Sequence, residues 1–427
     1  MTFMPSIKST DELAAHQLEG LKWTVQHAYN GSPLYKSKLD EAGVAPTDIK
    51  SLDDLKRLPF TMANDLKDGY PFPLLSVPHE KVVRIHASSG TTGRRKVLCY
   101  TKKDVDDWAH MFARCYETAG LTREDRVQIA VGYGIWTAGW GFQNGVETFG
   151  AMSIPLGPGN LDMHVQFIQD FGTTVMCCTS SMALLLAEEL SRRGVKDQVK
   201  IKKLIYGSER TSEAMRKKIA EGLGGVELFD IPGMTELYGP GTGLECHEHA
   251  GIHYWADYFI LELLDPVTLE PVEPGELGEM VVTTLCKEAA PLIRYRTRDL
   301  TRLIPGPCAC GSIMPRHDRI LGRSDDMIIF RAVNIYPGQI DHILSSTGGI
   351  GSEYQIILER REDGKDYMTV LVERGEEAAP EHDPATAGEI KRLIKNQVMV
   401  SANVELVDYG SLPRSDRKSK RVFDNRF

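Results

Sequence analysis

The residues with the clearest capacity for chemistry lie in a short run near position 90. The stretch HASSGTTGRRKV, from His86 to Val97, combines four hydroxyl residues, two glycines and three cations. Glycine lets a backbone approach a ligand closely, and consecutive N–H groups with hydroxyls can surround an anionic oxygen. The run therefore predicts a phosphate-binding loop, and a polyphosphate would use all of it.

This run differs from the P-loop of nucleotide-binding proteins. A P-loop has the spacing G-x-x-x-x-G-K-[ST] and leads into a helix. Here the two glycines are three positions apart, Val97 follows Lys96, and the next residues, VLCY, read as a strand. We expect a phosphate loop between two strands, which disfavours a kinase. A flexible polar hairpin without a ligand is the alternative.

A second group of residues has the chemistry of a zinc site. The segment ECHEHAGIHYW supplies Cys246 and His253, and the segment GPCACG supplies Cys308 and Cys310. Four nitrogen and sulfur ligands suit tetrahedral Zn²⁺. The Cys-x-Cys spacing is tighter than usual for zinc, so four unliganded side chains on turns are the alternative. The hypothesis is a structural zinc ion.

A third segment, VGYGIWTAGWGFQNG, places large aromatic side chains between glycines. Tyr133, Trp136 and Trp140 offer flat apolar walls, and the glycines leave space for a ring. This pattern favours a pocket for a compact aromatic acid. Core aromatic residues beside a tight turn are the alternative.

The elements that must position these groups follow from the apolar pattern. Residues 9–30 read as a helix with Ser9 and Glu12 in a capping box. Strands and helices then alternate to about residue 230, which predicts parallel sheet covered by helices. Beyond about residue 240, short strands between turns indicate a β-rich subdomain. The last part reads β-α-β-β-α-β, the ferredoxin-like order.

The expected fold class is α/β with a separate α+β domain at the C-terminal end. Residues 1–322 would form a large domain of parallel sheets, helices and the β-rich subdomain, and residues 323–427 a small ferredoxin-like domain. The 427 residues are enough for two domains, with 42% hydrophobic and 26% charged residues.

The charge and composition exclude several classes of partner. A net charge of −9 argues against nucleic acid or an anionic membrane as the main partner. No apolar run approaches the roughly 20 residues of a membrane span, and we expect no signal peptide. Eight cysteines at uneven spacing do not indicate a disulfide framework, so the cytoplasm is the expected compartment.

Six segments, in order, resemble the adenylate-forming superfamily of acyl-CoA synthetases. They are SSGTTGRRK, YGSER at 206–210, FDIPGMTELYG at 229–239, YRTRDL at 295–300, GRSDDMI at 322–328 and LPRSDRKSKR at 412–421. The stretches HASSGTTG, GYGIWTAGWG, YRTRDLTRL and RVFDNR resemble the phenylacetate–CoA ligase branch of that superfamily. The resemblance covers nearly the whole chain.

The resemblance implies a reaction in two halves. A small aromatic carboxylate attacks the α-phosphate of ATP to give acyl-adenylate and pyrophosphate, and the thiol of coenzyme A then displaces AMP. Mg²⁺ would be held by Glu236. The β- and γ-phosphates would be held by Ser88, Ser89, Gly90, Thr91, Thr92, Gly93 and Lys96.

The resemblance also implies a nucleotide pocket and a catalytic lysine. The nucleotide would contact Ser208, Glu209, Asp230, Ile231, Gly233, Met234, Thr235, Asp299 and Arg323. Within this set Asp299 would hold the ribose, although a salt bridge to Arg296 or Arg298 is its alternative. Lys418 would bridge the carboxylate and the α-phosphate, with Lys420 as a competitor because Arg417 replaces the usual glycine. Asp325 would be the hinge between the domains.

Two other functions remain open from the sequence. The acyl group could pass to a carrier-protein thiol instead of coenzyme A, and Ala332 replaces a glycine near the expected coenzyme A tunnel. A more distant alternative is a zinc-bearing nucleotide sensor without catalysis. A homodimer is an open possibility for the assembly.

Overall fold

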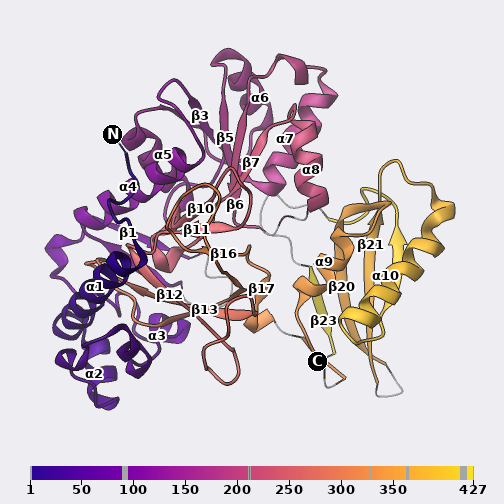
Figure 1. Ribbon diagram of the computed structural model, residues 1–427. Coiled ribbons are helices and arrows are strands. Elements are labelled where there is room, and N and C mark those ends of the chain that lie inside the picture. The colour runs from indigo at the N-terminus through magenta and orange to yellow at the C-terminus, as the bar shows by residue number, and fades with distance from the viewer. Residues whose placement is uncertain are drawn as a thin grey trace. The chain divides into compact units, whose positions relative to one another are not determined.

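The chain forms two compact units (Figure 1). This computed structural model describes residues 2–88, 95–209, 211, 213–326, 328–331, 333–361, 365–413 and 421–426. The first unit comprises Met1–Thr179, Asp197–Ser208 and Val226–Arg319, and the second comprises Ser180–Lys196, Glu209–Gly225 and Ile320–Phe427. None of the helices in these described residues is long and apolar enough to cross a membrane.

The first unit begins with the expected N-terminal helix. Helix α1 spans Thr10–Gly31, and the Ser9 hydroxyl accepts the backbone N–H of Glu12 at 3.1 Å as its cap. Two shorter helices follow, α2 (Pro33–Glu41) and α3 (Ala63–Asp68). Leu21, Val25 and Ala28 of α1 are fully buried, so one face of the predicted helix packs into the core.

A five-stranded parallel sheet lies at the centre of the first unit. Its strands are β3 (Arg126–Ile129), β4 (Met152–Pro155), β5 (Val175–Thr179), β6 (Lys203–Gly207) and β7 (Glu227–Asp230). Their order is β4-β3-β5-β6-β7, and every neighbouring pair is parallel. Helix α4 (Lys102–Thr118) precedes β3, and the connections between the strands include α5 (Ala138–Phe149) and α6 (Leu161–Asp170). The predicted parallel sheet is confirmed, and the carboxyl ends of β6 and β7 meet at one edge.

Helix α5 was not predicted, because its sequence is rich in glycine. Those glycines serve close packing instead of a turn. A Cβ at Gly141 would lie 2.4 Å from the Phe112 ring, and one at Gly145 would lie 2.3 Å from the Phe112 Cβ. Helices α4 and α5 therefore pack closely only while both positions lack side chains.

Antiparallel strands make up the rest of the first unit, as predicted for residues beyond 240. Strands β12 (Phe259–Leu264), β13 (Gly278–Thr284) and β14 (Tyr295–Thr301) pair in that order. A second sheet has the order β10 (Gly243–Glu245), β11 (Ile252–Tyr254), β16 (Arg316–His317) and β15 (Leu303–Ile304). The short strands β8 (Gly233–Met234) and β9 (Gly239–Pro240) form a separate hairpin.

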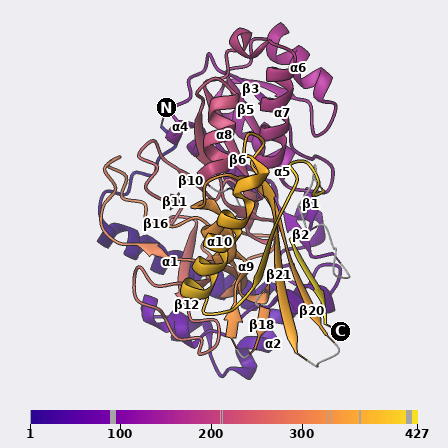
Figure 2. The same ribbon diagram turned by 90° about the vertical axis from the view of Figure 1, so that its right-hand side faces the viewer.

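The second unit contains helices α7 (Ser180–Arg192) and α8 (Glu213–Gly222) and the C-terminal elements. The latter are β17 (Gly322–Arg323), β18 (Ile328–Phe330), β19 (Val333–Ile335), α9 (Pro337–Ser345), β20 (Ile350–Arg360), β21 (Asp366–Arg374), α10 (Asp383–Gln397), β22 (Asn403–Val407) and β23 (Val422–Asn425). Alternate residues of β20 and β21 are buried under α9 and α10, which lie side by side in Figure 2. The core of this α+β part is therefore one sheet face covered by two helices.

The sheet of the C-terminal part differs from the expected strand arrangement. Its order is β22-β21-β20-β23, whereas the first predicted strand, which contains β18, pairs with β19 in a hairpin of its own. The tight turn between β18 and β19 passes through Arg331, whose φ is 50°. Strand β23 from the chain end pairs with β20 instead. The six predicted elements occur in the predicted order, but the strands β19 and β23, which pair with β18 and β20, were not predicted.

Candidate active site

The predicted phosphate loop is closed by a two-stranded hairpin. Strand β1 (Arg84–Ala87) pairs antiparallel with β2 (Val97–Tyr100), so the expectation that the loop joins two strands is confirmed. At the base of the loop the Ser88 N–H donates to the Lys96 carbonyl at 3.0 Å, and the Lys96 N–H donates to the Ser88 hydroxyl at 3.2 Å. The remaining predicted phosphate ligands, Ser89, Gly90, Thr91, Thr92 and Gly93, lie outside the described residues.

Lys96 and Glu236 are brought together although they are far apart in the sequence. The Lys96 ammonium forms an ion pair with the Glu236 carboxylate, and the Tyr295 hydroxyl donates to the same Glu236 Oε1 at 2.8 Å. Glu236 is buried, which raises its pKa, but Lys96 and Tyr295 outweigh this effect and hold the pKa below its ordinary value. The Glu236 carboxylate is therefore ionised at a site with little access to solvent.

The segment that carries Glu236 is anchored by aromatic side chains. The Tyr100 hydroxyl donates to the Tyr238 carbonyl at 2.8 Å, and the Trp108 indole donates to the Pro240 carbonyl at 2.8 Å. The hairpin of β8 and β9 is so tight that a Cβ at Gly233 would lie 2.2 Å from the Pro240 Cα. Met234 and Thr235, predicted to contact the nucleotide, lie half-buried between these anchors.

The predicted adenine-binding residues of the first unit lie at the carboxyl ends of adjacent strands. Ser208 follows β6 with a φ of 73°, and Asp230 ends β7. The Ile231 N–H donates to the Tyr206 carbonyl at 2.9 Å, which ties the two strand ends together. Such an edge is where parallel sheets commonly bind ligands.

Glu209, in the second unit, has a role that the sequence did not indicate. Its carboxylate accepts the Ser181 N–H at 2.9 Å, the Ser181 hydroxyl at 2.7 Å and the Ser180 hydroxyl at 3.2 Å. These groups form the N-terminus of α7, where a carboxylate is favoured by the helix dipole. Glu209 therefore caps α7.

The ribose candidate Asp299 lies half-buried on β14. Its N–H donates to the Thr297 hydroxyl at 3.0 Å. The two arginines considered as its partners both contact Glu279: Arg296 through two bonds of 2.8 Å and Arg298 at 3.4 Å. Glu279 is buried, so this pairing fixes β14 against β13 and sets the position of Asp299.

The aromatic segment surrounds the start of α5. The rings of Tyr133 and Trp140 meet edge to face, with centroids 5.6 Å apart, and the Trp140 indole donates to the Gly134 carbonyl at 3.0 Å. A Cβ at Gly132 would lie 2.8 Å from the ring of Trp136. The Tyr133 hydroxyl is buried and has no hydrogen-bond partner among the described residues. Such an atom is costly to bury alone and suits a polar ligand group.

A cavity of about 450 Å³ lies beside the phosphate hairpin. Its walls combine residues of β1 and β2 with Ile135 from the aromatic segment. The full lining is Tyr70, Pro71, Phe72, Ile85, Ala87, Arg95, Val97 and Ile135. Tyr133, Trp136 and Trp140 do not belong to this lining, so the aromatic segment reaches the cavity through Ile135.

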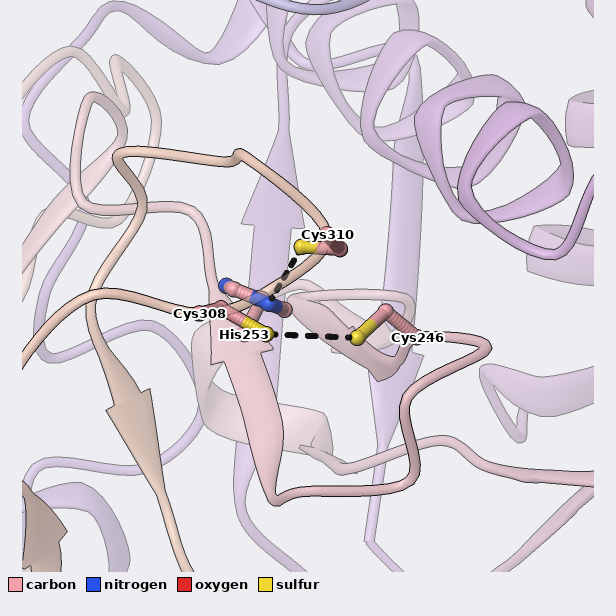
Figure 3. A group of neighbouring side chains, drawn as sticks. All are labelled: Cys246, His253, Cys308 and Cys310. Atoms are coloured by element: carbon pink, nitrogen blue, oxygen red, sulfur yellow. Dashed lines mark hydrogen bonds between the residues drawn. The ribbon is translucent and has the colours of Figure 1, made fainter.

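The four proposed zinc ligands form one cluster (Figure 3). The ligand atoms of Cys246, His253, Cys308 and Cys310 all lie within 4.8 Å of one another. Cys246 and Cys308 have their sulfurs 3.7 Å apart, and the Cys310 sulfur lies 3.3 Å from His253 Nε2. His253 Nδ1 faces the Met314 carbonyl at 2.8 Å and donates to it, which leaves Nε2 free for a metal.

Comparison with known proteins decides the family. The chain matches the family described as "AMP-binding enzyme" over residues 15–286 and the "AMP-binding enzyme C-terminal domain" over residues 332–426. The phenylacetate–coenzyme A ligase of Escherichia coli (strain K12) is 43% identical, with 98% of this chain and 96% of that protein covered. The ligase of Thermus thermophilus is 41% identical with both chains fully covered. This chain belongs to the phenylacetate–CoA ligase family.

The fold of this family member agrees with a solved structure. The crystal structure of 2-hydroxyisobutyryl-CoA ligase in the postadenylation state, in complex with R3-HIB-AMP, has a TM-score of 0.87. It is 28% identical, and the match covers 100% of this chain and 91% of that chain. The predicted superfamily and fold class are confirmed.

The remaining predicted residues of this ligase-family chain lie in the second unit or outside the described residues. Arg323 forms a bidentate pair with Asp325, with bonds of 2.9 and 3.0 Å, so the two hinge-segment candidates contact each other. Lys418 and its competitor Lys420 lie outside the described residues, as does Ala332. The sequence reasoning missed Tyr295, whose only signal was its place at the start of YRTRDL.

Proposed function

We propose that this chain is an ATP-dependent ligase that activates a small aromatic carboxylate. The acid attacks the α-phosphate of ATP to give acyl-AMP and pyrophosphate, and coenzyme A then takes the acyl group and releases AMP. The observation that supports this most is the meeting of Lys96, Glu236 and Tyr295 at the base of the phosphate hairpin. Adenylation needs a cation and a metal-binding carboxylate at one triphosphate.

The donor set at this place fits Mg²⁺. Hard cations prefer oxygen ligands, and one or two carboxylates with phosphate oxygens are sufficient. Glu236 supplies a buried, ionised carboxylate, and Mg²⁺ when bound would neutralise charge on the β- and γ-phosphates. Lys96, whose ammonium now pairs with Glu236, would turn to the phosphate oxygens. Ser88 and the loop residues Ser89–Gly93 would complete the phosphate contacts.

The nucleotide would be held by the strand ends described above. Ser208, Asp230 and Ile231 would lie along adenine, and Asp299 would accept hydrogen bonds from the ribose hydroxyls. Gly233, Met234 and Thr235 would contact the nucleotide from the tight hairpin, and Glu209 and Arg323 are the other proposed nucleotide contacts.

In this proposal the C-terminal domain supplies the catalytic lysine and moves between the two half-reactions. We assign residues 1–322 to the nucleotide- and acid-binding domain and residues 323–427 to a mobile C-terminal domain, with Asp325 at the hinge. Lys418 would bridge the two anions as they approach, with Lys420 as the alternative. The Arg323–Asp325 pair supports the hinge role, because a short polar pair can open and re-form as the backbone turns.

The acid would bind beside the aromatic segment. The phenylacetate–CoA ligases named above support an aryl acid. Tyr133, Trp136 and Trp140 would form the pocket, and the unpartnered Tyr133 hydroxyl favours a ring that carries a hydroxyl or an N–H group. Acids with and without such a group, at equal ring size, should therefore differ in kcat/KM.

The cysteine cluster supports a structural zinc ion as part of the proposal. Cys246, Cys308 and Cys310 with His253 have the ligand number and spacing that tetrahedral zinc requires. No step of acyl transfer uses this ion, and its function would be to hold β10, β11 and the segment before β16 together. Cytoplasmic location and a homodimer complete the proposal.

One assay tests the proposed function. AMP and pyrophosphate are measured against a panel of aryl acids, with and without coenzyme A. We expect pyrophosphate without coenzyme A, and thioester only when it is present. A thioester that forms on a carrier protein but not on coenzyme A would identify the carrier-protein thiol as the acyl acceptor. ATP binding without any AMP would indicate a nucleotide sensor.

A further inference from the structure

A lysine is completely buried behind the candidate magnesium ligand. Lys287 lies just after β13 and has no exposed surface. A buried ammonium loses its hydration, so it needs compensating partners in the protein. Burial lowers the pKa of Lys287 to about 8, while Asp104 and Glu236 act in the opposite direction.

The Lys287 ammonium contacts the segment that carries Glu236 and the ring of Tyr100, which anchors that segment. The ammonium donates to the Glu236 carbonyl at 3.0 Å. It also lies 4.6 Å from the ring centroid of Tyr238 and 4.9 Å from that of Tyr100. Both rings present their faces to the cation, which is the favourable geometry for a cation–π contact.

The first turn of α4 holds Lys287 in this place. Asp104, also fully buried, accepts the N–H of Glu288 at 2.7 Å and that of Ala289 at 2.9 Å. The Thr101 hydroxyl donates to the Glu288 carboxylate at 2.8 Å. The backbone on the C-terminal side of Lys287 is therefore held against the first turn of α4.

We propose that Lys287 is a positioning residue for adenylation: it holds the Glu236 carbonyl and so aims the Glu236 carboxylate at Lys96 and the triphosphate. This rests on the proposed function. An apolar side chain would fill the same volume without the cost of burying a charge. The Lys287 ammonium instead donates a hydrogen bond to the backbone carbonyl of Glu236, the residue whose carboxylate must be placed accurately.

The test compares Lys287→Met with a matched control, Lys103→Met. Lys103 lies on α4 close to the same segment, but its ammonium contacts Asp107 and the Cys286 carbonyl, not Glu236. ATP binding is measured by calorimetry over a range of Mg²⁺ concentrations, and pyrophosphate release gives kcat. For Lys287→Met we expect the Mg²⁺ needed for half-maximal ATP binding to rise at least about ten-fold and kcat to fall at least about ten-fold. The control should keep both values.

Two results would overturn the proposal. One is a folded Lys287→Met protein that binds ATP at the wild-type Mg²⁺ concentration. The other is a loss of thermal stability with both readouts unchanged, which would show a purely structural role. If the methionine variant does not fold, Lys287→Leu replaces it, because leucine also removes the donor for the Glu236 carbonyl, and the same changes in both readouts are expected.

The proposed function is tested separately. A wild-type protein that forms no AMP with any acid would refute that function, whereas the Mg²⁺ dependence of ATP binding would still decide the role of Lys287.

Discussion

At the scale of single residues, the Tyr295 hydroxyl is the neutral partner of the Glu236 carboxylate. Tyr295→Phe removes a hydrogen bond of 2.8 Å to a buried anion while keeping the ring. A hydrogen bond to a charged group contributes about 1.5–3 kcal/mol, so we expect kcat/KM for ATP to fall at least about ten-fold. Tyr29→Phe is the control, because its hydroxyl bonds the exposed Asp40. Equal kcat/KM in the two variants would contradict this role.

A buried histidine makes stability depend on pH. His86 donates from Nδ1 to the Ile135 carbonyl at 3.1 Å, and among the described residues its Nε2 has no hydrogen-bond partner. Burial lowers the pKa of His86 to about 4. The unfolded chain takes up the proton near pH 6.5, so stability is lost as the pH falls from there towards 4.

The measurement compares wild type with His86→Gln in urea unfolding from neutral to acid pH. Across this window wild type should lose about 3 kcal/mol more than the variant, from the difference between the two pKa values. A gap between the two proteins that stays constant with pH would show that His86 is not the titrating group.

The sequence indicated individual site residues better than it indicated their partners. Lys96 and Glu236 were predicted from local motifs. Lys287 gave no such signal, and Tyr295 gave only its place at the start of YRTRDL. Their roles arise only when β2, β14 and the segment after β13 lie next to one another. Glu209 was expected at adenine, but its cap on α7 depends on a contact with Ser181 across 28 positions of the chain.

At the scale of elements, the glycines of α5 set the distance between two helices. Gly141→Ala would place a methyl group 2.4 Å from the Phe112 ring, so we expect a loss of about 1–3 kcal/mol in unfolding free energy. Gly388→Ala is the matched control, because α10 has open space at that position and alanine favours helix by about 0.5–1 kcal/mol. Chemical denaturation should shift the two variants in opposite directions. A stable Gly141→Ala protein would mean that α4 and α5 can separate freely.

The cysteine cluster predicts that metal supports the β10–β11–β16 sheet. Purified protein should contain about one zinc per chain, and Cys310→Ser should lose it and lower Tm by about 5 °C or more. Cys286→Ser, outside the cluster, should retain the metal. Elemental analysis and thermal unfolding give both values. Metal-free wild-type protein with the Tm of Cys310→Ser would remove zinc from the proposal.

The spacing of apolar residues predicted helices and strands well where one face of the element is buried. It predicted them poorly where glycines form part of a helix or where strand pairing joins distant segments. Strands β3, β5, β6 and β7 and helix α1 were predicted from their apolar residues, whereas the short edge strand β4 was not. Helix α5 was missed because its glycines resemble turn residues. The partner of β18 could not be predicted, since strand order depends on contacts between distant segments and not on local pattern.

At the scale of the whole molecule, the two half-reactions separate the roles of the C-terminal lysines. We expect Lys418→Ala to lose adenylation by at least about 100-fold, because a cation at the approaching anions stabilises the transition state. Thioester formation from supplied acyl-AMP and coenzyme A should persist. Lys420→Ala is the companion variant, and the opposite outcome for the pair would move the catalytic role to Lys420.

The domain boundary at residue 322 stays a prediction from the sequence. The change from the large to the small part was expected near residue 322, and one unit ends at Arg319. That α7 and α8 group with the second unit could not be predicted, because this grouping reflects contacts between distant segments, such as the hydrogen bond of 3.0 Å from the Lys218 ammonium to the Tyr409 hydroxyl.

The pairing of Lys96 with Glu236 has a consequence for the order in which ligands enter. A lone divalent ion is repelled by the ammonium, and uncomplexed ATP is repelled by the carboxylate. Only a metal–nucleotide couple replaces both halves of the pair at once. The site without ligand should therefore bind the metal–ATP complex in preference to either the metal ion or free ATP. At concentrations where the complex binds, neither the metal ion alone nor free ATP should occupy the site.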